Sequence, residues 1–116
     1  MAFEDVIETA VEKLSGNERL RSNLTDDEFN PILDWAIAWL EKKTAKAKDK
    51  AATQKIAAKE LKRIESAMKA INDLLKGGNT PTLESAATPL KIKLPQKKIG
   101  IRNRAMFIQE VLKLIE

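Results

Sequence analysis

Two groups of closely spaced basic side chains have the composition that suits an anionic partner. One group lies between residues 90 and 104, where no acidic residue occurs, and the other lies between residues 42 and 55. The first consists of Lys91, Lys93, Lys97, Lys98, Arg102 and Arg104, and the second of Lys42, Lys43, Lys46, Lys48, Lys50 and Lys55. Such density favours phosphate groups, because each neutralised phosphate releases condensed counterions. The sequence therefore allows nucleic-acid binding through the arm of residues 90–104, assisted by the Lys-rich run 42–55.

The same charges also have a purely structural interpretation. The 90–104 arm contains no aromatic side chain on which a base could stack. Residues 1–34 carry nine acidic and three basic side chains, so the arm could instead lie against the acidic first helix. A Lys-rich run is usually a solvated helix face or a hairpin tip. Nucleic-acid binding is therefore the alternative function and not the leading one.

The groups that most enzymes use for catalysis are missing. The chain has no Cys and no His, which excludes thiolate nucleophiles, imidazole acid–base catalysis and zinc sites of the Cys/His kind. Asp26, Asp27 and Glu28 are adjacent on a helix and cannot all face one cation, so the stretch is better explained as a capping box that starts at Thr25. No spacing of Ser or Thr with Lys indicates a nucleophile. We expect a protein that is not an enzyme, with no cofactor and no metal.

Two apolar faces indicate an interaction surface. The first carries both tryptophans, Trp35 and Trp39, and covers about 200° of the helical wheel, whereas a surface helix needs only about 100°. The second has the 4, 3, 4, 3, 4 spacing of a heptad seam at Ala57, Leu61, Ile64, Met68, Ile71 and Leu75. Aromatic side chains are enriched at protein interfaces. We expect a second copy of the chain or another protein to bind at Trp35, Trp39, Ile64, Met68 and Ile71.

The helices that hold these residues can be traced from apolar spacing and capping residues. Apolar side chains at helical spacing predict a first helix at about 3–15, with one face formed by Phe3, Val6, Ile7, Ala10, Val11 and Leu14. Asn17 caps a short helix that reaches to Leu24. The Trp-bearing helix, at about 26–43, has two alternative starts. Thr25 forms the capping box with Glu28, or Asn30 caps a helix whose first residue is Pro31.

Whether residues 31–76 form one helix or two decides the architecture. There is no Gly and no Pro between Ile32 and Lys76. An unbroken helix would be about 68 Å long, whereas a compact chain of this length is about 35 Å across. Going back from Ala57 along the seam leads to Gln54 and Lys50, so the two apolar faces do not join. We favour a hairpin with its break within 43–52 and a second helix at 52–76. A long rod that pairs with a second chain is the alternative.

The last part of the chain combines short elements. Thr80 and Pro81 predict a short helix that ends near Ala87, and the alternating residues between Pro89 and Pro95 predict an extended arm or a lone edge strand. A last helix follows over 103–115, with Asn103 as its cap. The whole chain of 116 residues is expected to form a single all-α domain, a bundle of four to five helices with an extended basic arm before the last one.

Composition also sets the expected location and the leading function. The first residues are acidic and no apolar stretch follows them, so no signal peptide is expected. No apolar run approaches the roughly 20 residues of a membrane span, so we do not expect a membrane partner. We expect a cytoplasmic location. The leading function is a small non-enzymatic protein–protein interaction module that self-associates, as a dimer, through the Trp-bearing helix or the heptad seam.

Overall fold

The computed structural model describes residues 2–115, except for the side chains of residues 2–4, so Phe3 lies outside what can be compared. These residues form five α-helices, one 3-10 turn and no strand, which confirms the all-α prediction. The elements are α1 (Ala2–Ser15), η1 (Glu18–Leu20), α2 (Asp26–Thr44), α3 (Lys50–Leu74), α4 (Leu83–Leu90) and α5 (Arg104–Leu114).

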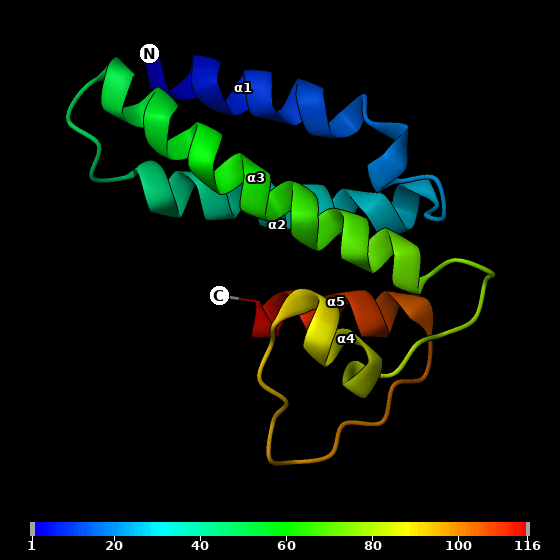
Figure 1. The fold of residues 1–116 in the computed structure, drawn as a ribbon. Coiled ribbons are helices and arrows are strands. Elements are labelled where there is room, and N and C mark those ends of the chain that lie inside the picture. Colours follow the sequence, from blue (N-terminus) through cyan, green and yellow to red (C-terminus); the bar gives the residue numbers. More distant parts are fainter. Residues whose placement is uncertain (1, 116) are drawn as a thin grey trace.

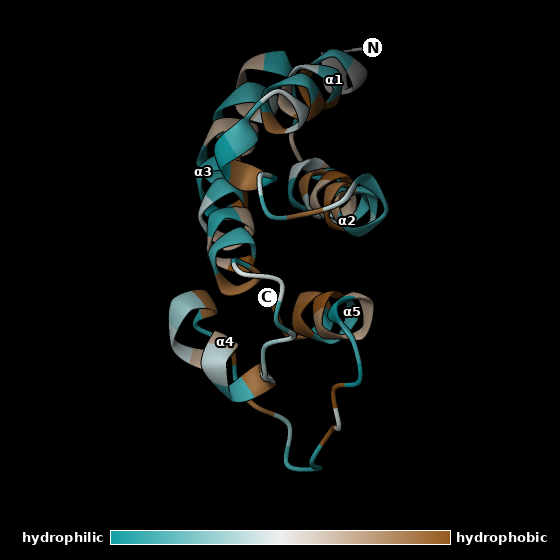
Figure 2. Ribbon diagram, turned by 90° about the vertical axis from the view of Figure 1, so that its right-hand side faces the viewer, coloured by the Kyte–Doolittle hydropathy of each residue, from teal (hydrophilic) through white to brown (hydrophobic). Residues whose placement is uncertain are grey.

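The helices are arranged around α3, which contacts α1, α2, α4 and η1. Helices α1, α2 and α3 pack together, and α4 and α5 lie at the opposite end from α1 (Figure 1). Viewed from the side, α2 and α5 lie on the same side of α3 (Figure 2). One buried cluster draws on all five helices, with Leu14, Ile32, Met68, Ala86 and Phe107 as members from α1 to α5 in turn. The apolar faces that the sequence contains are therefore directed into one core.

The long stretch 31–76 forms a helical hairpin, as the phase of the apolar faces favoured. Helix α2 ends at Thr44, and α3 begins at Lys50 after a short turn. Asp49 caps α3 by accepting a hydrogen bond from the Ala52 amide at 2.8 Å. The molecule measures 43 × 31 × 19 Å, which leaves no room for a rod of about 68 Å. The rod that pairs with a second chain is therefore wrong.

The capping box at Thr25 sets the start of α2. The Thr25 hydroxyl accepts from the Glu28 amide at 3.2 Å, and the Thr25 amide donates to Glu28 Oε1 at 2.9 Å. The alternative start at Pro31 is wrong, because Pro31 lies inside the helix. Proline in the second turn removes one backbone hydrogen bond and strains the helix locally. The reciprocal cap and the burial of Phe29 on the first turns offset that loss.

The region between α3 and α5 differs from the expectation in two ways. The short helix begins at Leu83 with Thr82 as its cap, two residues later than predicted, and it includes Pro89. The helix ends at Leu90, and Lys91 caps it in a left-handed backbone conformation (φ 53°). The Lys91 amide donates to the carbonyls of Ala87 and Thr88. From Ile92 to Asn103 the chain has no helix and no strand, so the lone edge strand is wrong. We call residues 92–103 the basic loop.

Candidate functional site

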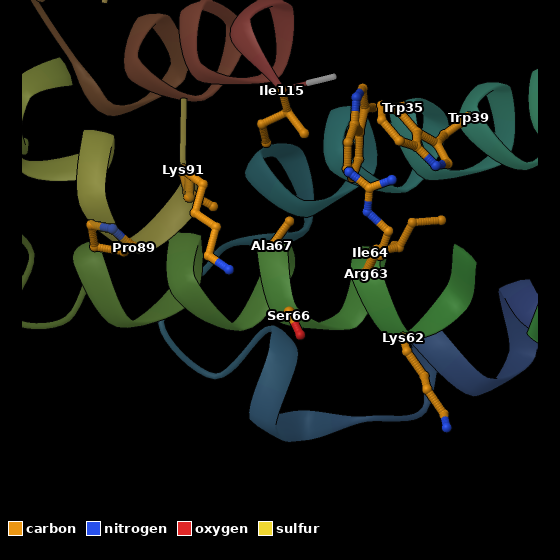
Figure 3. A pocket seen from close by; sticks show the side chains of 11 residues that line it. Trp35, Trp39, Lys62, Arg63, Ile64, Ser66, Ala67, Pro89, Lys91 and Ile115 are labelled. Atoms are coloured by element: carbon orange, nitrogen blue, oxygen red, sulfur yellow. The ribbon is translucent and has the colours of Figure 1, made fainter. Parts of the chain in front are cut away.

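Trp35 and Trp39 line a groove of about 350 Å³ on the surface of the bundle. We call it the Trp groove. Both indoles come from α2, Arg63 and Ala67 face them from α3, and the end of α4 and the residue after α5 complete the walls (Figure 3). The lining consists of Trp35, Trp39, Lys62, Arg63, Ile64, Ser66, Ala67, Pro89, Leu90, Lys91 and Ile115. In Figure 3, Arg63 extends toward the indoles, whereas Lys62 and Ser66 point away from them.

A hydrogen bond to a nearly buried carboxylate holds one of the two indoles. Trp39 Nε1 donates to Glu60 Oε2 at 2.8 Å, and Glu60 is only 7% exposed. The guanidinium of Arg63 lies 3.9 Å from the same oxygen. A charged acceptor makes a stronger hydrogen bond than a neutral one, so this contact fixes how the Trp39 ring is oriented. Glu60 was not identified from the sequence. The signal that was available is the expected hairpin, which brings the helix after residue 52 back alongside Trp39 and so places an acidic residue such as Glu60 within reach of it.

The indole rings form a connected aromatic and cationic cluster. The ring centroids of Trp35 and Trp39 are 5.6 Å apart at an interplanar angle of 47°. The ammonium of Lys43 lies 5.1 Å from the centroid of the Trp39 ring, and the guanidinium of Arg63 lies 5.6 Å from it. Cations at this distance are attracted by the negative face of the ring. The groove therefore has an aromatic floor to which positive charge is already bound.

Two further hollows adjoin the Trp groove. The first, which we call the Lys42 hollow, shares Trp35, Trp39 and Ile115 with the groove and adds Ala38, Lys42 and Lys43. The second, the Lys93 hollow, shares Lys91 with the groove and adds Ile92, Lys93, Lys113 and Leu114. Because the three depressions share lining residues, they form one continuous face. A separate groove between α1 and α3 has no aromatic lining and carries side chains of both signs, among them Asp5, Lys13 and Lys50.

Apart from Ile64, which lines the Trp groove, the heptad seam is not part of this face. Ile64, Met68 and Ile71, predicted to meet a partner, are 1%, 0% and 0% exposed, so the structure places their side chains in the core of the bundle. The seam turns inward because α1, α2 and α4 of the same chain cover α3. Trp35 and Trp39 remain half-buried and reach the surface. Of the described large hydrophobic side chains, Leu94 alone is exposed, at 42%. The described helices therefore cover most of the apolar surface whose excess had suggested a dimer.

The basic arm is divided between the solvent and the core. Lys91, Lys93, Lys97, Lys98 and Arg102 are exposed, while Ile92 is buried and anchors the basic loop. The basic loop lies at the end of the molecule opposite α1 in both views, so the arm does not lie against the acidic first helix (Figures 1 and 2).

Arg104 is not part of the exposed basic set. Its Nε lies 2.9 Å from Glu28 Oε2, its Nη2 donates to Glu28 Oε1 at 3.1 Å, and Nη2 also donates to the Asn23 carbonyl. Both side chains of the pair are largely buried. Arg104, predicted as a nucleic-acid contact, therefore joins the start of α5 to the start of α2 in this structure.

The acidic stretch after Thr25 is used within the fold. Asp26 pairs with Arg21, and Glu28 serves both the capping box and Arg104. Among residues 2–115, apart from the undescribed side chains at the N-terminus, no group of three or more acidic residues is arranged to hold a metal ion. No helix in the same part of the chain combines the length and the apolar character that crossing a membrane requires.

Comparisons with models of known protein families, with curated protein sequences and with solved structures found no match.

Proposed function

We propose that this protein is a non-enzymatic protein–protein interaction module and that the Trp groove is its binding surface. The observation that supports this proposal is the half-buried pair Trp35 and Trp39, which lies at a groove between helices instead of in the core. Tryptophan combines a large apolar surface with few rotatable bonds, so it contributes strongly at interfaces for little loss of conformational entropy. The hydrogen bond to Glu60 further pre-orients Trp39 in the free protein.

The partner that the sequence suggested first is a second copy of the chain. With the seam buried, the Trp groove and its two hollows are the surface with aromatic side chains that a second copy or another protein could contact. Light scattering on a size-exclusion peak separates the two: a dimer lost on Trp35→Ala supports self-association at the groove. A monomer up to high concentration directs the proposal to another protein.

A peptide array tests the proposal itself. The full chain is applied to random synthetic peptides, and wild type is compared with Trp35→Ala. We expect a set of peptides that bind the wild type and lose binding in the variant, because truncating an interface tryptophan typically costs about 2 kcal/mol or more. Equal binding by both proteins, or no binding together with a monomeric chain, would contradict the proposal.

A second candidate function rests on the exposed bases at and after the end of α4. These exposed bases form no ion pair with the described residues and are therefore accessible to the phosphates of an anionic polymer; they are Lys91, Lys93, Lys97, Lys98 and Arg102. We expect a labelled single-stranded oligonucleotide to bind at low salt and to lose affinity when Lys97 and Lys98 are both changed to Gln. Absence of an anisotropy change at low salt would assign these bases to solubility alone.

A further inference from the structure

Charge of one sign surrounds the Trp groove. Seven basic side chains line the groove and its two adjoining hollows, and no acidic side chain of the described residues does so. Arg63 and Lys113 have acidic partners in Glu60 and Glu110. The other five, which form no ion pair with the described residues, are Lys42, Lys43, Lys62, Lys91 and Lys93. A bound partner that brought negative charge would neutralise the charge of these five side chains, which the described residues leave without an ion pair.

The floor of the groove favours a carboxylate and an apolar side chain over a nucleobase. A base would stack on an indole, but the ring of Trp39 already has Lys43 and Arg63 over it and Trp35 packed against it. A carboxylate can bind these cations where they are. The volume of about 350 Å³ lies at the lower end of ligand pockets, so it suits one or two apolar side chains beside Trp35 and Ile115.

A second copy of this chain lacks that combination of groups. Its acidic helix α1 exposes Asp5, Glu8 and Glu12, but the described apolar side chains of the same helix are either buried, as Ala10 and Leu14 are, or half-buried, as Val6, Ile7 and Val11 are. The described large hydrophobic residue that is exposed, Leu94, lies among bases in the basic loop. Acidic groups and an exposed large apolar side chain are therefore not presented together on one segment of the described chain.

We infer that the Trp groove binds an acidic segment of another protein, in which carboxylates flank one or two large apolar side chains. This inference rests on the proposed function and adds the chemistry of the partner. The apolar side chains occupy the space between Trp35, Ala67 and Ile115, and the carboxylates contact Lys43, Arg63 and Lys91 around it. Electrostatic attraction speeds the encounter, and burial of the apolar side chain slows release.

The test uses two synthetic peptides that differ in charge alone. The acidic peptide has about three helical turns, with Leu and Phe on one side and Asp and Glu on the other, and lacks Trp. The neutral peptide has Asn and Gln in place of the acids. Binding of each to the full chain is followed by the fluorescence of Trp35 and Trp39, which are the two tryptophans of the chain. We expect the acidic peptide to bind at least about tenfold more tightly at an ionic strength of about 0.1 M, and the difference to shrink at about 1 M.

Two double variants locate the binding site. The groove variant combines Lys43→Gln with Lys91→Gln, and the matched control combines Lys69→Gln with Lys76→Gln, which are exposed bases that line none of the three depressions. We expect the groove variant to bind the acidic peptide roughly five- to twentyfold more weakly, at about two- to fivefold per charge. The control variant should bind as wild type does. All four side chains are exposed, so both variants should fold.

Each outcome either supports or overturns the inference. Tighter binding of the acidic peptide that the groove variant alone weakens supports it. Equal binding of the neutral peptide overturns the inference but leaves the groove as an interface, so the proposed function stands. Equal loss in both double variants overturns it by showing non-specific attraction. Oligothymidylate is the competitor. If it displaces the acidic peptide, binds more tightly than that peptide and is weakened by the same groove variant, the inference is overturned and the groove is assigned to single-stranded nucleic acid. If neither peptide binds, the inference fails, and the peptide array decides the proposed function separately.

Discussion

Replacing Trp39 with Phe should destabilise the fold through the carboxylate it leaves behind. Glu60 is 7% exposed, and its acceptor oxygen lies 2.8 Å from Trp39 Nε1 but 3.9 Å from Arg63, whose side chain is 55% exposed. A hydrogen bond to a charged group contributes about 1.5–3 kcal/mol. The phenylalanine ring is smaller and buries less apolar area, which costs about a further 0.5–1 kcal/mol. We expect Trp39→Phe to lower the free energy of unfolding by about 2–4 kcal/mol.

A double-mutant cycle isolates the hydrogen bond from the change of ring. Glu60→Leu removes the acceptor, and because the indole of Trp39 is half-buried its N–H can bind water, so the loss should be about 1 kcal/mol. Combining Trp39→Phe with Glu60→Leu replaces both partners with apolar groups, so Trp39→Phe then adds only the roughly 0.5–1 kcal/mol of the smaller ring to the cost of Glu60→Leu. The cycle should therefore give a coupling energy of about 1.5–3 kcal/mol.

Urea unfolding followed by far-ultraviolet circular dichroism measures these free energies without relying on the indoles. Trp35→Phe is the matched control, because Trp35 makes no side-chain hydrogen bond with the described residues, and it should cost about 1 kcal/mol or less. If the two changes at Trp39 and Glu60 add to within about 0.5 kcal/mol, the bond does not hold the indole. The argument that Glu60 pre-orients the floor of the Trp groove would then be refuted.

Two further predictions concern the contacts that hold the ends of the bundle together. Arg104→Met removes the partner of the largely buried Glu28 and should cost about 2–4 kcal/mol in urea unfolding, while Glu28→Gln, which keeps an acceptor for the capping box, should cost less. A loss below about 0.5 kcal/mol would mean that water replaces the pair. Asn72→Leu should cost about 2–3 kcal/mol although leucine is more apolar, because Asn72, 2% exposed, accepts from the Asn23 amide at 2.8 Å and donates to the Arg19 carbonyl at 3.0 Å. Unchanged or higher stability would contradict the view that these backbone groups depend on the Asn72 side chain.

Most of the helices could be predicted because their ends depend on residues a few positions apart. The capping box of Thr25 and Glu28, the Asn17 cap and the Asn103 cap all form between neighbours in the sequence and all appear in the structure. The errors have the same local origin. Thr82 competes with Thr80 for one cap, and Asp49 is the cap that marks the break in the Lys-rich stretch. Asp is a favoured N-cap residue, so Asp49 indicates a start of α3 within a residue or two of Lys50.

The candidate site could be predicted only in part. Trp35 and Trp39 were identified because their spacing and size are visible in the sequence, whereas Met68 and Ile71 were assigned to a surface but lie in the core, and Arg104 was assigned to a nucleic-acid contact but pairs with Glu28. An apolar face at helical spacing has the same pattern whether it packs against its own chain or against another. The sequence likewise does not distinguish an exposed basic side chain from one in an ion pair, because the partner can be distant in the chain: Glu28 lies 76 residues from Arg104.

The sequence by itself determined that the chain is all-α, roughly where most helices lie, and that it has no Cys and no His, because these properties depend on composition and on contacts within one or two turns. Only the tertiary structure decided that the heptad seam is internal and that Arg63, Lys91 and Ile115 meet the two tryptophans in one groove. The physical reason is that helix packing depends on the sum of many weak contacts between residues far apart in the chain. The two basic segments are visible in the sequence, but only the packing brings Lys42 and Lys43 of one and Lys91 and Lys93 of the other to the Trp groove and its two hollows.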